Sequence, residues 1–179
     1  MEMSDLIFWD SKSPYGIGRS VARGISAILN LDTEIYENPV IINGFNGRNF
    51  PYDAHRVLNS LELFRRRKEI TENILLIIPY DIMERMHSPV YGLARPGSKV
   101  AVVSSERLKN EFYGLPPSDD YLIERLSKEG AHELGHLHGL KHCNEEDCIM
   151  YSPKTLDDLE RKKRDLCEIC HASIINTTD

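Results

Sequence analysis

The stretch HELGHLHGLKHC, residues 132–143, places four histidines and one cysteine within twelve residues. On a helix, side chains four residues apart lie on one face, so His132 and His136 can direct their rings at a single point. Glu133 is rotated by about 100° from His132 around the helix axis, which brings its carboxylate beside that point without making it a ligand. The spacing therefore predicts two metal ligands and a neighbouring base.

A third imidazole requires the chain to turn back toward the same point. Gly139 permits the positive φ angle that ends a helix sharply, and His142 follows three residues later. Three neutral imidazoles leave a tetrahedral Zn²⁺ ion one open position, which is typical of a catalytic zinc site. We therefore predict His132, His136 and His142 as zinc ligands; the alternative is a helix with surface histidines. His138 fits no ligand position, and an exposed, supporting or substrate-contacting role stays open for it.

The combination of three ligands and a carboxylate matches one type of chemistry. A zinc ion lowers the pKa of its bound water toward about 7 and polarises a carbonyl group. Glu133 can accept the proton of that water and pass it to a leaving amine, acting first as general base and then as general acid. The motif therefore predicts a hydrolase that cleaves peptide or amide bonds with a zinc-bound water and Glu133 as the catalytic residue.

All four cysteines lie in the last quarter of the chain, in two pairs. Cys143 and Cys148 form the first pair, and Cys167 and Cys170 form a Cys-x-x-Cys pair. Two thiolate pairs separated by a loop can complete a closed tetrahedral site, which is typical of structural zinc. The alternatives are four free cysteines or a redox-active second pair. We predict two zinc ions per chain, one at the histidines and one at the cysteines.

Length and composition favour a single folded domain. The chain has 179 residues, of which 41% are hydrophobic and 28% are charged, as expected of a soluble globular protein. The formal net charge of −6 does not favour polyanion binding, and we interpret the basic runs 65–68 and 161–164 as solvated helix faces rather than a nucleic-acid patch. The sequence has no basic leader and no apolar run of about 20 residues. We expect a cytoplasmic monomer that binds peptide substrates and neither membranes nor nucleic acid.

Strands alternate with helices in the part of the chain before the motif. Residues 73–79, NILLIIP, are apolar on both faces, as expected of a central strand that is covered on both sides. Asp53 is placed as the N-cap of a helix whose apolar residues recur at helical spacing. Residues 43–47 read as a turn, and 95–98 suggest a hairpin. The predicted strands are 6–9, 34–42, 73–79, 90–94 and 99–104, and the predicted helices are 19–29, 53–68, 119–140 and 155–164.

One glycine pattern admits a different interpretation. Gly16 and Gly18 follow the first predicted strand and precede a helix, which partly matches a dinucleotide-binding fingerprint. Val21 stands where the third glycine of that fingerprint belongs, so the helix could not pack closely around a pyrophosphate. We interpret the segment as a plain strand-to-helix turn, with nucleotide binding as the alternative.

The histidine motif, the CIM sequence that ends at Met150 and the CEIC sequence at 167–170 together resemble the archaemetzincin family of metzincin-clan zinc metalloproteases. The resemblance implies an α+β fold, with a mixed twisted β-sheet and two main helices in an upper lobe, residues 1–140, and a small zinc-stabilised lower lobe, residues 141–179. It also implies that Met150 lies beneath the histidine ligands and that the strand around 91–94 is an edge that pairs with an extended substrate. Tyr151 comes one residue earlier than the zinc-proximal tyrosine of some other metzincins, so it is assigned no role.

The favoured function is a zinc metallopeptidase, and relatives by resemblance suggest an aminopeptidase acting on small peptides. The alternative is a zinc-stabilised module that binds protein or nucleic acid without catalysis, because the basic run 161–164 lies between the two cysteine pairs. That alternative leaves the histidines unexplained. A pseudo-peptidase has no direct support, since no member of the ligand set is missing.

Overall fold

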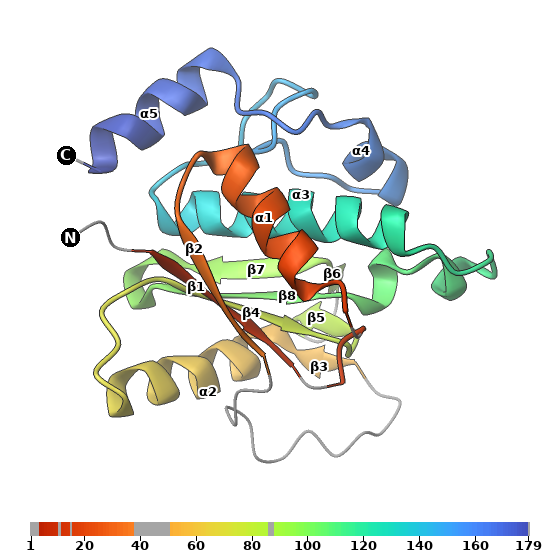
Figure 1. The fold of residues 1–179 in the computed structure, drawn as a ribbon, viewed down its shortest axis with the longest axis horizontal. Coiled ribbons are helices and arrows are strands. Elements are labelled where there is room, and N and C mark those ends of the chain that lie inside the picture. Colours follow the sequence, from red (N-terminus) through yellow and green to blue (C-terminus); the bar gives the residue numbers. More distant parts are fainter. Residues whose placement is uncertain (1–3, 11, 15, 38–50, 86–87, 179) are drawn as a thin grey trace.

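A five-stranded mixed sheet lies at the centre of the molecule (Figure 1). The computed structural model describes residues 4–10, 12–14, 16–37, 51–85 and 88–178. The sheet contains four parallel strands, and its fifth strand, β7, pairs antiparallel with β8 at one edge. This arrangement confirms the prediction of a mixed sheet. In spatial order the strands are β2 (Thr33–Glu37), β1 (Asp5–Trp9), β4 (Ile74–Ile78), β8 (Val100–Ser104) and β7 (Gly92–Arg95).

The central strand β4 is buried along its whole length, as its uninterrupted apolar sequence predicts. Successive side chains of a strand point to opposite faces, so one apolar strand can serve two cores. Leu75 and Ile77 belong to the core on one face of the sheet, and Ile74, Leu76 and Ile78 belong to the core on the other. The strand therefore needs helices on both sides.

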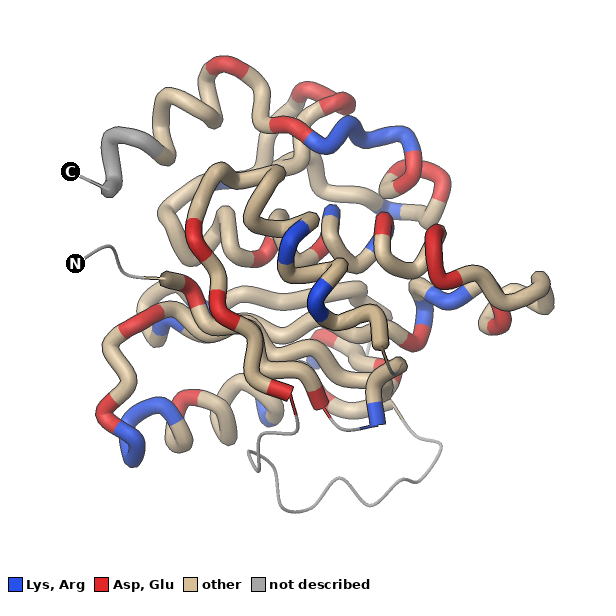
Figure 2. Tube along the Cα trace, in the orientation of Figure 1, with Lys and Arg blue, Asp and Glu red and all other residues tan. Residues whose placement is uncertain are grey.

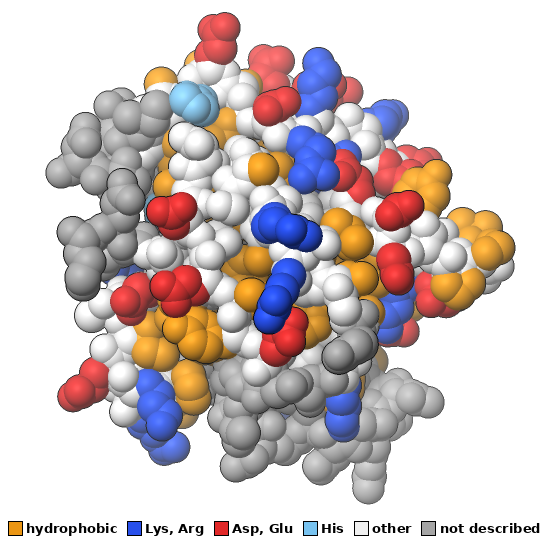
Figure 3. All heavy atoms as spheres, viewed as in Figure 1, with side chains coloured by type: hydrophobic (Ala, Val, Ile, Leu, Met, Phe, Trp, Pro, Cys, Tyr) orange, Lys and Arg blue, Asp and Glu red, His pale blue; other side chains and the backbone are white. Residues whose placement is uncertain are grey.

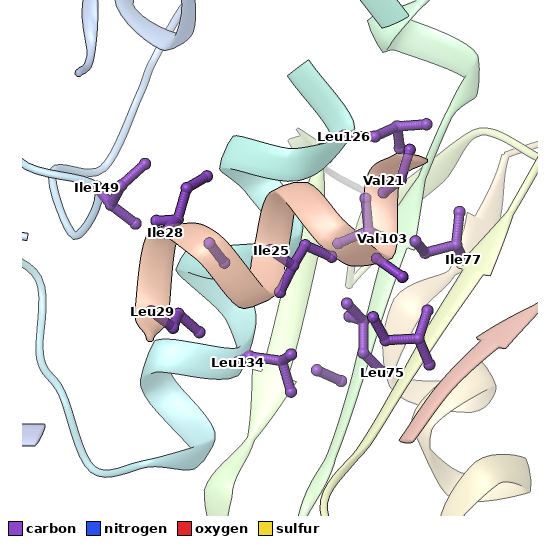
Figure 4. Close-up of a cluster of buried hydrophobic side chains, with 14 of the residues drawn as sticks. Val21, Ile25, Ile28, Leu29, Leu75, Ile77, Val103, Leu126, Leu134 and Ile149 are labelled. Atoms are coloured by element: carbon purple, nitrogen blue, oxygen red, sulfur yellow. The ribbon is translucent and has the colours of Figure 1, made fainter. Parts of the chain in front are cut away.

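Three helices cover the two faces. α1 (Gly18–Leu29) and α3 (Asp119–Leu137) pack on one face, and α2 (Ala54–Arg67) packs on the other (Figure 1). Figure 4 shows side chains of α1, Ile25 among them, gathered with Leu75 of the sheet and Leu134 of α3. The described part of the chain thus has three main helices, one more than the predicted two, because α1 and α3 pack side by side on one apolar face of the sheet.

Capping residues fix where the two longest of these helices begin. The Asp53 carboxylate accepts a hydrogen bond from the backbone N–H of His55 at 2.8 Å, which confirms the predicted N-cap of α2. Ser118 caps α3 by accepting from the N–H of Tyr121. The prediction that this helix extends to residue 140 is wrong: α3 ends at Leu137, because the chain turns at Gly139, whose φ is +85°.

The predicted strand 90–94 is in fact divided between two sheets. Its first residue ends β6 (Ser88–Val90), which forms a small second sheet with β3 (Tyr52–Asp53) and β5 (Ile82–Glu84). Its later residues form β7, and a 3₁₀ turn, η1 (Pro96–Ser98), connects this strand to β8. The predicted hairpin is therefore confirmed, but the edge strand is shorter than expected. Apolar character alone could not reveal the change of partner strand.

The segment that follows α3 packs back onto the same core as α1. It contains α4 (Leu156–Arg161), which Thr155 begins with a capping box, and α5 (Glu168–Thr178). The predicted helix 155–164 ends early, at Arg161, and α5 was not predicted. Ile149 lies beside Ile28 of α1, within one buried cluster (Figure 4). Burial of this cluster holds the cysteine-containing segment against α1 and α3.

Two predictions concern the chain around β2. The predicted strand 34–42 corresponds to β2, which ends at Glu37; residues 38–42 and the predicted turn 43–47 lie outside the described residues. The turn before α1 contains Gly16 with φ +85°, and Val21 is fully buried in the core. Val21 thus occupies the space that a third fingerprint glycine would leave for close approach, which favours the plain strand-to-helix turn.

Candidate metal centres

His132 and His136 point from adjacent turns of α3 to one place. Their Nε2 atoms lie 3.2 Å apart. The Nδ1 atom of His132 lies 2.8 Å from the backbone oxygen of Ile149, and that of His136 lies 2.8 Å from the oxygen of Leu140. Because a carbonyl oxygen only accepts, each Nδ1 carries the ring proton and donates it. Both oxygens belong to the chain that follows α3, so this chain sets the orientation of both rings.

The protonation state of these rings suits a cation. Burial lowers the pKa of His132 far below its usual range, and burial likewise lowers the pKa of His136, so both rings are neutral at pH 7. With Nδ1 protonated, the two Nε2 atoms are lone-pair acceptors that face each other and share no proton. A tetrahedral zinc ion with Zn–N bonds of about 2.0–2.1 Å places its ligand nitrogens about 3.3 Å apart. The observed spacing fits that ion.

His142 completes the group. The positive φ of Gly139 turns the chain, and the ring centroid of His142 lies 5.3 Å from that of His132 and 4.8 Å from that of His136. One nitrogen from each of the three rings lies within 4.8 Å of the others. His132 is buried and His142 is exposed, so the group opens to solvent on one side. The structure therefore brings together the three histidines that the spacing predicted.

Glu133 lies beside this group with its carboxylate buried. It is 4% exposed, and its Oε2 atom has no hydrogen-bond partner among the described residues. Burial, reinforced by the neighbouring Glu129, raises the pKa of Glu133 well above its usual range. A buried carboxylate oxygen without a partner costs free energy. An arriving proton donor or cation would satisfy it.

A close contact with the edge strand fixes where Glu133 can lie. A Cβ atom added to Gly92 of β7 would lie 2.7 Å from both Cγ and Oε1 of Glu133. The missing side chain of Gly92 therefore makes the room in which the carboxylate sits. A glycine within a strand is the sequence pattern that marks close approach of another group, and it could have pointed to this contact.

The histidines and Glu133 line a cleft of about 500 Å³. Its wall includes the start of β7 and the preceding Tyr91. Glu129, one helical turn before Glu133, also lines it, although the side chain is 4% exposed and its Oε2 has no hydrogen-bond partner in the described residues. Nothing in the local motif singled out Glu129, because its position in the cleft depends on where β7 crosses α3. The cleft thus holds two buried carboxylates.

Met150 lies against the turn of α3 that carries the two histidines. It is fully buried, and a Cβ added to Gly135 would lie 2.5 Å from its Sδ atom. The backbone N–H of Cys143 donates to the oxygen of Met150 at 2.9 Å, and Cys143 forms an isolated bridge with Tyr151. The side chain of Tyr151 is not among those that line the cleft. The thioether therefore supports the helix at the level of the histidines.

The four cysteines form a second group of potential ligands. Their sulfur atoms all lie within 4.8 Å of one another, and the Sγ atoms of Cys143 and Cys167 are 3.7 Å apart. That separation is far beyond the S–S bond of about 2.05 Å, and all four cysteines are free. Tetrahedral zinc with Zn–S bonds of about 2.3 Å separates its sulfur ligands by about 3.8 Å. The group fits zinc and contradicts a disulfide.

Burial raises the pKa of Cys148, and backbone donors around the sulfur atoms oppose this effect by favouring thiolates. The N–H of Glu145 donates to Cys143 Sγ at 3.4 Å, and the N–H groups of Met150 and Cys167 donate to Cys148 Sγ at 3.4 Å and 3.3 Å. Hydrogen bonds to a charged acceptor stabilise the charged form. The donors therefore match the ionised sulfur that zinc requires.

His138, whose role the sequence left open, belongs to neither group. Its Nε2 atom lies 2.6 Å from Oδ2 of the buried Asp5, and Asn73 donates to the other oxygen of Asp5 at 2.9 Å. Asp5 begins β1, and His138 is the C-cap of α3. The contact joins the end of the helix to the start of a central strand, so His138 supports the fold.

Several side chains of the two basic runs have partners within the fold. The Arg65 side chain donates hydrogen bonds to the backbone oxygens of Thr71 and Glu72, and Arg66 forms an ion pair with Glu62. In Figure 2 the basic stretch before α5 is flanked by acidic segments, and Figure 3 shows acidic and basic side chains interspersed on the viewed face. Lys162 is the exception to the predicted solvated face, because it is fully buried. Ion pairs thus occupy Arg66 in the first run and Arg161, Lys163 and Arg164 in the second.

Several known proteins are similar to this chain. The model of peptidase family M54 matches residues 41–176. An archaemetzincin of Pyrococcus horikoshii is 47% identical over 94 residues, which cover 52% of this chain and 50% of that protein. The chain thus spans about half the length of the curated relatives that it matches most strongly. None of the helices in the described ranges is long and apolar enough to cross a membrane.

Solved structures extend the similarity to almost the whole chain. A zinc-dependent peptidase of Methanocorpusculum labreanum is 40% identical, with a TM-score of 0.88 and coverage of 96% of this chain and 100% of that one. An archaemetzincin of Methanopyrus kandleri is 24% identical, with a TM-score of 0.78 and coverage of 98% and 95%, and shares the fold. The mixed α/β architecture is therefore common to all three.

The contact between Gly92 and Glu133 makes a prediction about stability. Gly92→Ala should lower the free energy of unfolding by about 1–3 kcal/mol, because the added methyl group overpacks the space of a buried side chain. Gly97→Ala, in the turn of the same hairpin, is the matched control, since a Cβ there meets nothing within 4 Å. Urea unfolding measures both variants. Equal unfolding free energies would contradict the close contact.

Proposed function

The chain belongs to peptidase family M54, the archaemetzincin family, and on this basis we propose that it is a zinc-dependent metallopeptidase. The observation that carries the proposal is the pair of neutral histidines whose Nε2 acceptors face each other at 3.2 Å beside a buried glutamate in an open cleft. His132, His136 and His142 would hold the catalytic zinc. Bound there, zinc supplies a Lewis acid that polarises a carbonyl and acidifies water.

Glu133 is proposed as the general base. Burial raises its pKa, which makes its carboxylate a better proton acceptor than an exposed glutamate. The carboxylate takes a proton from the attacking water and delivers it to the departing amine, so one residue serves both proton transfers. Gly92 leaves the room that the carboxylate needs for this position.

The edge strand β7 supports binding of an extended peptide. Within the described sheet β7 pairs with β8 alone, so the backbone groups on its other side are free to pair with a substrate strand. The start of β7 also lines the cleft that contains the histidines. A peptide added to this edge would run past Glu133 and expose successive peptide bonds to it.

The proposed role of Glu133 predicts the effect of removing its carboxylate. Glu133→Ala should lower kcat for peptide hydrolysis by about 10²–10⁴-fold, because general base catalysis contributes about that factor. Zinc content must be measured in the same preparations, so that loss of metal is separated from loss of the base. Asp120→Ala, at an exposed position of the same helix, is the control. Unchanged hydrolysis in zinc-loaded Glu133→Ala would refute the proposal.

We assign the four cysteines to a second, structural zinc. Four thiolates close the coordination sphere, so this ion has no position for substrate. It would stabilise residues 141–179 as a small lower lobe beneath the upper lobe 1–140 of a metzincin-like fold. The shared burial of Cys148, Ile149 and Cys170 supports a lobe that packs onto the core rather than a separate domain.

The two-zinc assignment predicts both a metal count and a difference in stability. Elemental analysis should find about two zinc ions per chain. Cys148→Ser should lower the free energy of unfolding by about 4 kcal/mol or more, because loss of a structural metal is among the largest single-residue effects. His142→Ala should cost less, since this residue is exposed and its site is open. A count near one, or equal unfolding free energies, would refute the assignment.

Glu129 supports a preference for peptides with a free N-terminus, as an aminopeptidase requires. Its buried carboxylate lines the cleft one turn from Glu133, and its Oε2 atom has no hydrogen-bond partner in the described residues. A substrate α-ammonium group is a cationic donor that could satisfy it. We therefore propose that Glu129 binds the amino terminus of small peptides.

N-terminal acetylation tests this preference. Acetylated peptides should show kcat/KM lower by about tenfold or more, because a hydrogen bond to a charged group contributes about 1.5–3 kcal/mol. The difference should shrink in Glu129→Gln and persist in Glu84→Gln, which alters another carboxylate on the cleft wall. Equal cleavage of free and acetylated peptides by the wild type would indicate an endopeptidase.

A further inference from the structure

Lys162 is the most deeply buried charged side chain in the segment that carries the cysteines. It directly follows α4 and is 1% exposed. Its Nζ atom donates to the backbone oxygens of Ile149 at 2.9 Å and of Tyr151 at 3.1 Å. These oxygens flank Met150, so one ammonium group holds the turn from both sides. A lysine is almost never fully buried unless such partners satisfy it.

One of these oxygens connects Lys162 to a proposed zinc ligand. The Ile149 oxygen also accepts the Nδ1 proton of His132 at 2.8 Å. A carbonyl oxygen has two lone pairs and can accept from both donors. Lys162 thus fixes the direction of the oxygen that sets the ring of His132. Partners of this kind determine how accurately a histidine ligand is aimed.

The charge of Lys162 is matched by the cleft. Burial lowers the pKa of Lys162, and Glu129 and Glu133 oppose this effect by interacting favourably with the ammonium group. Both carboxylates are 4% exposed, so little solvent screens the interaction. Lys162 therefore donates its hydrogen bonds to the turn and interacts electrostatically with the two buried carboxylates.

The neighbours of Lys162 show that its inward direction is specific. Arg161, Lys163 and Arg164 form ion pairs at the surface with Asp158, Asp147 and Glu124, respectively. α4 is itself connected to α3 through Glu160. Lys128 of α3 donates to the backbone oxygen of Glu160 at 2.9 Å, and Arg125 of α3 donates to the Glu160 carboxylate. The backbone at residue 162 is thus held in register with α3.

We propose that Lys162 is a positioning residue through which the cysteine-bearing segment orients His132 for zinc. This proposal rests on the proposed histidine zinc site, and it adds a residue that the histidine motif does not contain. Lys162 is not among the residues that line the cleft. It acts by holding the Ile149–Tyr151 turn in the one position from which the Ile149 oxygen meets the His132 ring.

Cobalt(II) titration of the metal-free full-length protein tests the proposal without any peptide substrate. Cobalt at the cysteines gives thiolate charge-transfer absorption together with d–d bands, so binding at the histidines is followed as the d–d absorption that grows without charge-transfer absorption. Lys162→Met should raise the cobalt Kd of the histidine site about 10–100-fold, the usual effect of removing such a partner, and leave the cysteine site unchanged. Lys163→Met, at the adjacent exposed position, should match the wild type. A wild-type Kd in Lys162→Met would overturn the proposal.

A double variant separates positioning from charge balance. Lys162→Met/Glu129→Gln removes one buried carboxylate charge together with the ammonium, and it carries the test if Lys162→Met alone does not fold. We expect it to fold and to keep the weakened histidine site. If the double variant recovers the wild-type cobalt Kd, Lys162 acts only by balancing the charge of Glu129. If the double variant does not fold, Lys162 is needed for folding and not specifically for the histidine site. Either result overturns the proposal.

The outcome is independent of the proposed peptidase activity. A wild-type protein that binds cobalt at the histidines but cleaves no peptide would refute the proposed function and leave the role of Lys162 intact. If the wild type cleaves peptides and Lys162→Met binds cobalt as tightly as the wild type, the role of Lys162 is refuted and the proposed function is kept.

Discussion

The 3.2 Å contact between the Nε2 atoms of His132 and His136 is the constraint on which the site depends. Two neutral imidazoles repel when their lone pairs face each other, so this arrangement must be enforced from the other side of each ring. The enforcing groups are the backbone oxygens of Ile149 and Leu140, both in the chain after α3. The helix supplies the correct spacing, but the orientation comes from a different segment. A cation that accepts both lone pairs releases the repulsion that the fold maintains.

Packing around α3 makes this arrangement rigid. α1 and the sheet hold one side of the helix, and Met150 contacts its backbone at Gly135, between the two histidines. β7 contacts it at Glu133 through Gly92. Interiors packed at this density resist displacement of even one methyl group, so a small shift of any neighbour would move a reacting group. The sheet thus has two roles at the site: its face supports α3, and its edge strand β7 lies beside Glu133.

The parts that sequence predicted are those that depend on local spacing. The interval of four between His132 and His136 has one geometric meaning on a helix, and β4 reads as a buried strand because it is apolar on both faces. Glu129 and Lys162 gave no such pattern, since a glutamate on a helix and a lysine in a basic run are ordinarily solvated. Their burial follows from where other elements cross them. The division of the predicted strand 90–94 has the same origin, because choice of partner strand is a tertiary property.

The two candidate metal centres are joined by more than the peptide bond between His142 and Cys143. Cys143 donates its backbone N–H to the oxygen of Met150, and Cys148 begins the turn whose next residue, Ile149, orients His132. A closed site of four thiolates would therefore fix both ends of that turn before any catalytic ion arrives. The proposed histidine site would stay open to bind substrate, so it would gain no rigidity from a full set of ligands. A proposed cysteine site with four thiolates would be fully closed and would supply that rigidity through the turn. This difference gives a physical reason for placing the two proposed ligand sets on consecutive residues.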